Sequence, residues 1–159
     1  MKILLCALCA LLCILCLVGC TRQGDFFAPL RGEFSAEVDG TLHGMAFAAL
    51  VERSATDAGT DTTITFYAPA SLGGTVLHQA PDGSLTLTVG ELTRPAPDSF
   101  SPLFALFELK DAVGEAELQG EVTVVRGEGF SLSLDREGVP LAISGGAVSV
   151  RVLCFSPKT

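Results

Sequence analysis

Cysteine thiols are the side chains with the clearest chemical potential in this chain. The 159-residue sequence holds six cysteines, five of which precede Thr21 in a strongly apolar stretch: Cys6, Cys9, Cys13, Cys16 and Cys20. Close cysteine spacing can serve a metal site. Because the first four lie inside an apolar leader, we expect no metal there. The sixth, Cys154, then has no partner for an intramolecular disulfide in the rest of the chain.

The two histidines and a pair of aspartates are the other candidates for metal binding. Neither His43 nor His78 has a second histidine four residues away or a cysteine nearby. The sequence therefore predicts no zinc site at either position. Asp57 and Asp61 lie in one glycine-containing segment that weakly suggests calcium. The segment lacks the alternating oxygen ligands and the final glutamate of an EF-hand loop, which favours a solvated loop.

Sequence motifs that indicate catalysis are also missing. Glu115 and Glu117 lie close to Gly114 and Gly120, which is more typical of a loop or strand start than of an acid–base pair. No Gly-x-Ser-x-Gly elbow, phosphate loop or dinucleotide fingerprint occurs. We therefore predict a protein that is not an enzyme and needs no cofactor or metal.

The N-terminal segment has the features of an export signal. Lys2 supplies a positive charge, an apolar run follows, and Gly19 is a small residue at its end. Leu17-Val18-Gly19-Cys20 resembles the lipobox of bacterial lipoproteins. This resemblance implies removal of residues 1–19 and attachment of lipid to Cys20. A retained transmembrane helix is the alternative, since Ile3 to Cys20 approaches bilayer thickness.

The lipoprotein resemblance implies an address on the outer face of a membrane. Lipid on Cys20 would anchor the protein without a spanning helix. Residues 20–31 would form a lipidated tether, and residues 32–159 a single domain of ordinary size. The anchor would lie in the cell membrane, or in an outer membrane if the source has one. A net charge of −8 argues against nucleic acid as a partner.

Apolar and polar residues alternate with a period of two in residues 32–92, and this pattern predicts strands. The expected strands are Gly32–Val38, Leu42–Val51, Thr62–Ala68, Thr75–Gln79 and Ser84–Val89. Asp39-Gly40 and Pro81-Asp82-Gly83 are turn patterns. We expect Arg53–Asp61 to be a polar loop and Arg94–Asp98, with its two prolines, to interrupt the strands.

One helix is expected between two groups of strands. Ser99 or Ser101 can cap it and Pro102 suits its first turn. Its broad apolar surface predicts that it is nearly surrounded. Strands then return from Glu117, at 121–125, 130–134, 139–143 and 147–155, the last burying Cys154. The pattern predicts a mainly β (α+β) fold in which an antiparallel sheet with one apolar face wraps over a single helix.

This order of elements resembles the LolA/LolB-like lipoprotein carriers and receptors. The resemblance rests on Gly32–Val38, on Ile64–Pro69 followed by Asp82-Gly83 and Phe100–Leu103, and on Phe130–Asp135 followed by Gly138–Leu141. It implies a strongly curved, unclosed antiparallel half-barrel with helical structure on its concave side. Two features depart from that family. The long helix before the first strand is missing, and only position makes Arg53 or Arg94 a candidate for its buried arginine.

Two functions remain open at this point. In the first, the domain binds a lipid or another apolar ligand between sheet and helix, lined by Phe66, Phe104, Leu106, Phe107 and Leu132. In the second, these residues fill a dry core and the surface binds another envelope protein. Sequence periodicity does not separate the two, because a cavity wall and a core face have the same pattern. An open void would favour the first, and a close-packed interior the second.

Overall fold

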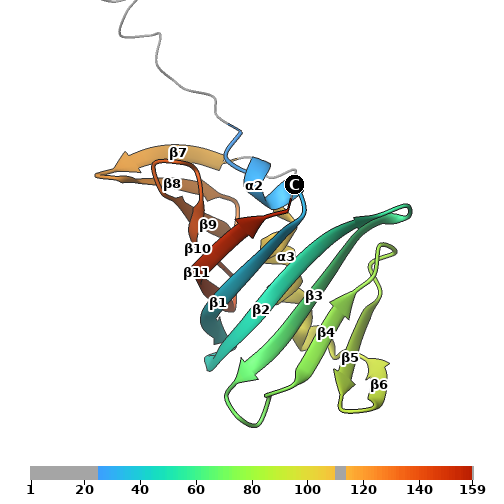
Figure 1. Ribbon diagram of the computed structural model, residues 1–159. Coiled ribbons are helices and arrows are strands. Elements are labelled where there is room, and N and C mark those ends of the chain that lie inside the picture. Colours follow the sequence, from blue (N-terminus) through green and yellow to red (C-terminus); the bar gives the residue numbers. More distant parts are fainter. Residues whose placement is uncertain (1–24, 110–113, 159) are drawn as a thin grey trace, which may run out of the picture.

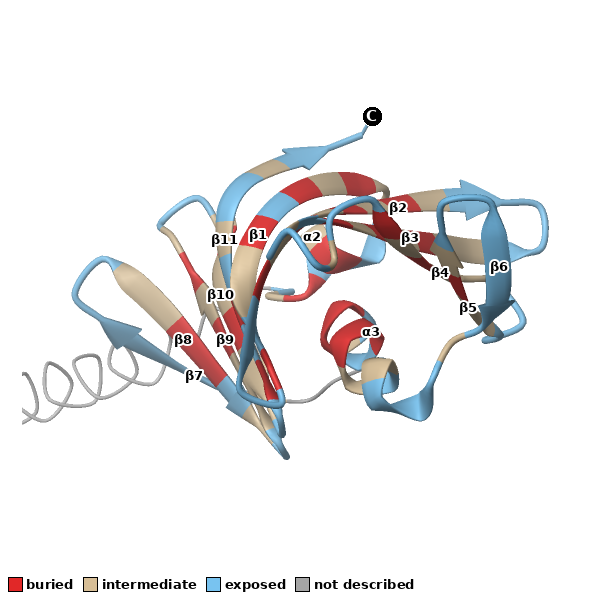
Figure 2. Cartoon of the chain, turned by 90° about the horizontal axis from the view of Figure 1, so that it is seen from below, coloured by how far each residue is buried: buried red, intermediate tan, exposed pale blue. Residues whose placement is uncertain are grey.

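The computed structural model describes residues 25–109 and 114–158. These residues form an eleven-stranded antiparallel sheet in the order β6-β5-β4-β3-β2-β1-β11-β10-β9-β8-β7. The first and last strands of this order do not meet, and the sheet curves around helix α3 (Figures 1 and 2). The predicted fold, an unclosed antiparallel half-barrel packed over one apolar helix, is confirmed.

The elements follow one another along the chain as two meanders. Helix α2 (Ala28–Arg31) precedes β1 (Phe34–Leu42), β2 (Met45–Thr56), β3 (Gly59–Ala68), β4 (Thr75–Gln79), β5 (Leu85–Val89) and β6 (Leu92–Pro95). The 3-10 turn η1 (Asp98–Phe100) leads into α3 (Ser101–Phe107). The second meander comprises β7 (Gly114–Gln119), β8 (Val122–Gly127), β9 (Phe130–Leu134), β10 (Pro140–Gly145) and β11 (Val148–Pro157). Antiparallel pairing of β1 with β11 joins the two meanders into one sheet.

One face of the sheet forms the core, as period-two alternation requires. In β3, Thr62, Ile64 and Phe66 are buried whereas Tyr67 is 51 % exposed. Figure 2 shows buried residues recurring along the strands and on the side of α3 that the sheet encloses. This arrangement buries the apolar face of the helix and that of the sheet against each other.

The turn expected at Asp39-Gly40 is wrong. Strand β1 continues through both residues to Leu42, and the chain reverses at His43 and Gly44, whose φ angles are 49° and 81°. Gly40 is needed for a different reason. A Cβ atom at this position would lie 2.1 Å from the carbonyl oxygen of Ser149 on β11, so the glycine permits close approach of two backbones.

The polar loop expected at Arg53–Asp61 is also wrong for most of its length. Strand β2 runs to Thr56 and β3 begins at Gly59, so the reversal takes two residues. Arg53 follows the inward series of Phe47, Ala49 and Val51. A long polar side chain at an inward position removes the alternation on which the sequence prediction depends.

Cys154 is exposed, whereas the sequence predicts a buried strand residue. Glu37 pairs with Cys154 but Val38 pairs with Val152, which leaves Leu153 as an extra residue in β11. Such a bulge reverses the alternation beyond it. Phe155 takes the inward position instead, and its ring centroid lies 5.2 Å from that of Phe34.

Three further features differ from expectation or extend it. Strand β6 occupies part of the segment predicted as a break, and β7 begins at Gly114, before the expected Glu117. Phe27 and Leu30 are buried, so packing begins before residue 32, where the sequence places the start of the domain.

No helix in the described part of the chain is long and apolar enough to cross a membrane.

The close approach at Gly40 generates a stability prediction. Gly40→Ala should lower the free energy of unfolding by about 2 kcal/mol, because β1 and β11 must separate to admit the methyl group. Gly32→Ala is the matched control, since a Cβ there meets nothing within 4 Å and its φ is −80°. Urea unfolding followed by circular dichroism measures both variants. Equal stability of the two would contradict the proposed β1–β11 contact.

Candidate binding site between the sheet and helix α3

Helix α3 lies in the hollow of the curved sheet. Pro102 occupies its first turn, as the sequence predicts. The expected serine cap is wrong, because Phe100 is the N-cap residue and makes no side-chain capping bond. A helix of seven residues is unstable in isolation. Its stability therefore comes from the side chains that it buries: Leu103, Phe104, Leu106 and Phe107.

The five residues predicted to line a ligand site are brought together by the fold. They come from β3, α3 and β9 and are at most 4 % exposed: Phe66, Phe104, Leu106, Phe107 and Leu132. All five belong to one hydrophobic cluster. Their role in binding a ligand stays a prediction, because a core and an occupied binding site bury the same side chains.

Aromatic rings connect α3 and its leading turn to the sheet. The centroids of Phe107 and Phe34 lie 6.3 Å apart, and those of Phe100 and Phe66 lie 6.4 Å apart. Phe66 in turn makes an edge-on contact with Phe47 at 5.6 Å. The two ends of the helical segment therefore pack on different strands, β1 and β3.

A surface hollow of 390 Å³ opens beside the start of the helical segment. Leu42, His43, Met45, Ser99 and Phe100 line it. Other hollows lie beside β1–β3, between the β1–β2 and β10–β11 turns, and between α2 and the turn after β9. None of these four, all formed by described residues, is lined by the five predicted ligand residues. The five residues are thus buried in the described form, and none of them opens onto these four hollows.

Arg53 is buried on strand β2, whereas the sequence predicts it in a polar loop. Its side chain is 1 % exposed, and Nη1 donates a hydrogen bond to the carbonyl oxygen of Phe107 at 2.6 Å. This carbonyl belongs to the last turn of α3, whose final carbonyls lack partners within the helix. Burial lowers the pKa of the guanidinium from its usual value, and the charge of Glu108 opposes this effect. The other positional candidate, Arg94, is exposed on β6.

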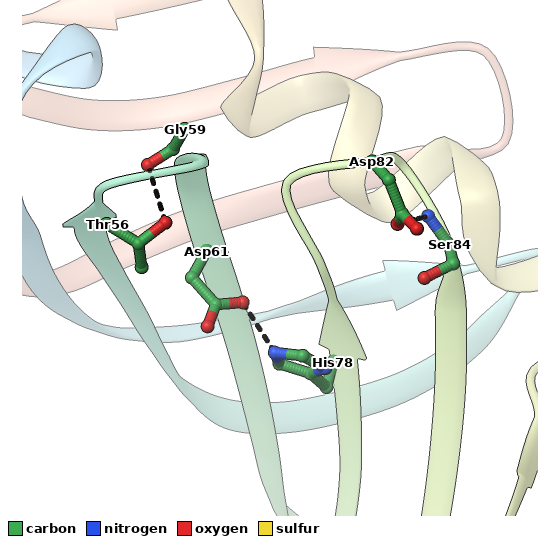
Figure 3. Close-up of polar contacts among 6 residues, drawn as sticks. All are labelled: Thr56, Gly59, Asp61, His78, Asp82 and Ser84. Carbon is green, nitrogen blue, oxygen red and sulfur yellow. Dashed lines mark hydrogen bonds and ion pairs between the residues drawn. The ribbon is translucent and has the colours of Figure 1, made fainter.

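Two of the residues considered for metal binding, His78 and Asp61, pair with each other between neighbouring strands (Figure 3). His78 Nε2 lies 2.5 Å from Asp61 Oδ1 on the neighbouring strand. In the turns beside them, Thr56 Oγ1 donates to the carbonyl of Gly59, and Asp82 Oδ1 accepts from the backbone N–H of Ser84. Among residues 25–109 and 114–158, no three histidine, cysteine or acidic side chains gather to hold a metal.

Comparison with known proteins supports the fold. No family model and no curated protein matches the chain. An uncharacterized conserved protein from Thermus thermophilus matches with a TM-score of 0.51 and 16 % identity, over 85 % of this chain and 84 % of that one. MucB matches with a TM-score of 0.52 and 15 % identity, over 89 % and 60 %. The Pseudomonas aeruginosa MucA/MucB complex matches with a TM-score of 0.49 and 16 % identity, over 85 % and 55 %.

These similarities concern the arrangement of the backbone. The chain spans about three fifths of the MucB chain that it matches. At 15–16 % identity, the shared feature is the fold rather than any set of site residues. The curved sheet around a short helix is therefore a known arrangement, and the chemistry of its concave face must be argued from this chain's own side chains.

The hydrogen bond from Arg53 to Phe107 generates a prediction about the helix. Arg53→Met should lower hydrogen-exchange protection of the α3 amides by about 10- to 150-fold, since a charge-assisted bond contributes roughly 1.5–3 kcal/mol. Amides in β9 and β10 should keep their protection. Arg94→Met removes an exposed arginine and is the matched control. Unchanged protection of α3 in Arg53→Met would show that apolar packing alone holds the helix.

Proposed function

We propose that this protein is a membrane-anchored, extracytoplasmic binding protein that holds an acyl chain or a similar apolar ligand between the sheet and α3. It catalyses no reaction in this proposal. The observation that supports it is that α3 is short and mostly buried. A helix too short to be stable alone covers a concave apolar face with four buried side chains. An acyl chain could cover the same face in its place.

Two side-chain hydrogen bonds support the view of α3 as a removable cover. Arg53 binds the carbonyl of Phe107 at the C-terminal end of the helix. His43 Nε2 lies 3.2 Å from the carbonyl oxygen of Ser99, just before the helix begins. His43 lies in the turn between β1 and β2, and Arg53 lies on β2. Both ends of the helical segment are therefore held by side chains of the β1–β2 hairpin.

The energetics of exchange favour a ligand with a long chain. Moving α3 away exposes Leu103, Phe104, Leu106 and Phe107 together with the strand residues below them. Each methylene of an incoming chain that becomes buried contributes about 0.8 kcal/mol. A chain of many methylenes can therefore offset the lost helix contacts, whereas a small apolar molecule cannot.

The predicted anchor would place this site close to a bilayer. Four residues separate Cys20 from Asp25, the first described residue. At about 3.5 Å per residue this linker reaches less than 20 Å. If Cys20 carries lipid, the domain stays within that distance of the lipids from which a ligand would come.

Lipidation can be tested by substitution of the leader cysteines. Cells expressing the full chain are grown with an alkyne-bearing palmitate, and the protein is examined for label. Cys20→Ala should abolish labelling because it removes the acceptor sulfur, whereas Cys16→Ala should retain it as the matched control. Label that survives in Cys20→Ala would contradict the predicted anchor.

Ligand binding can be tested with the full chain in isolated membranes. An oleic acid that carries a diazirine and an alkyne is added, photolysed and traced to labelled peptides by mass spectrometry. We expect label on the α3 and β9 peptides, and competition by unlabelled oleic acid. Ala105 is exposed on α3, so Ala105→Ser is a control variant that should keep the labelling. Label confined to outward-facing strand positions would argue against the proposal.

A second candidate function is binding of another envelope protein, and strand β7 favours it. This strand lies at one end of the sheet, and Leu118 on it is 72 % exposed. Unpaired strand edges can accept an extended segment of a partner. At the opposite end, β6 contains Pro95, which lacks a backbone N–H. Crosslinks to a protein at β7, with none to the oleic acid probe at α3, would favour this function.

A further inference from the structure

A row of polar side chains crosses the otherwise apolar concave face. Arg53 on β2 is the direct cross-strand neighbour of Thr62 on β3, and Thr62 is the neighbour of Gln79 on β4. Arg53 and Thr62 are 1 % and 2 % exposed. Directly opposed side chains on adjacent strands have Cβ atoms about 5 Å apart. The three polar groups thus form a continuous row, which we call the polar row.

Two buried atoms of the polar row lack hydrogen-bond partners among the residues that the structure describes. These atoms are Arg53 Nε and Gln79 Oε1, for which residues 25–109 and 114–158 supply no partner. Within residues 25–109 and 114–158, no carboxylate forms an ion pair with Arg53, although Glu108 attracts it from a greater distance. Buried polar atoms are nearly always paired, and a buried charge without a counter-ion is costly. The polar row therefore has hydrogen-bonding groups and a positive charge that a ligand could pair.

The polar row lies beside the end of the proposed acyl site. Arg53 reaches the last turn of α3 through Phe107. Its neighbour on β1, Phe34, packs its ring against that of Phe107. A chain that replaced α3 against the sheet would end with its head near the guanidinium. Departure of the helix would also release the Nη1 donor that the Phe107 carbonyl now occupies.

We infer that the polar row binds the anionic head of a single-chain amphiphile, a carboxylate or a phosphate monoester, whose tail takes the place of α3. The inference rests on the proposed function. Arg53 supplies the counter-charge and a planar set of N–H donors that suits both anions. Thr62 supplies a hydroxyl, and the Gln79 amide can donate or accept according to its orientation. A neutral head leaves the buried charge without a partner, and a cationic head is repelled.

Head-group selectivity of the unmodified protein is the direct test. The full chain in isolated membranes is labelled with the diazirine oleic acid, and unlabelled competitors are compared at equal membrane concentration. Oleic acid and oleyl phosphate should displace label from the α3 and β9 peptides at about tenfold lower concentration than oleyl alcohol. If oleic acid competes at a lower concentration than oleyl phosphate, the preferred head is a carboxylate. The reverse order indicates a phosphate monoester. Equal competition by all three overturns the inference.

Substitutions in the polar row provide the second arm. Arg53→Met should remove the preference for anions over the alcohol, while Arg53→Lys should keep part of it because the charge remains. Arg94→Met is the control and should leave the preference unchanged. If Arg53→Met does not fold, Thr62→Val and Gln79→Leu in turn should each reduce the preference. Selectivity unchanged in every folded row variant overturns the inference.

The two proposals fail in different ways. Labelling at α3 and β9 without a preference among the competitors contradicts the polar row but leaves acyl binding intact. No displaceable labelling of these peptides contradicts acyl binding itself, and the head-group inference falls with it. Anion preference together with label on the outer face places the anion site elsewhere and overturns the assignment of the polar row.

Discussion

The apolar concave face of an unclosed sheet is the constraint on which the rest of this structure depends. A closed barrel would bury that face within itself, whereas this sheet ends at β6 and β7 without their meeting. Something apolar must therefore cover the face, and α3 does so with four buried side chains. The helix is too short to be independently stable, so helix and sheet each require the other. Arg53 adds the polar contact that ties the last turn of α3 to β2.

The pairing of β1 with β11 holds the two meanders in the curvature that this cover requires. Backbone approach at Gly40 is close enough to exclude any side chain, and the bulge at Leu153 directs Phe155 onto Phe34. Phe34 in turn packs on Phe107 of α3. The junction of the meanders and the helix that they enclose are thus parts of one packing arrangement. Changes at the junction should reach the helix through these rings.

The residues expected to line a ligand site are buried in the described form, and this limits how a ligand could reach them. The five residues expected to line a ligand site belong to the common core, and the hollow lined by Ser99 and Phe100 opens at the start of the helical segment. In the proposed function, a ligand therefore replaces α3 rather than joining it. Arg53 Nε and Gln79 Oε1 are buried without a hydrogen-bond partner in the described part of the chain, which distinguishes this interior from a purely apolar core. An ordinary core avoids them, since each costs free energy that apolar side chains would not.

The sequence by itself determined the class of fold, because alternation and turn residues are local. Strand β4 has the predicted bounds, Phe66 on β3 and Leu132 on β9 face inward as expected, and Pro102 lies in the first turn of the helix. Only the tertiary structure decided which positions break the pattern. The inward direction of Arg53, the bulge before Cys154 and the neighbours of Thr62 all follow from strand register. Register is set by pairing between distant segments, so local periodicity could not reveal them. The lipid anchor predicted at Cys20 lies outside the described residues.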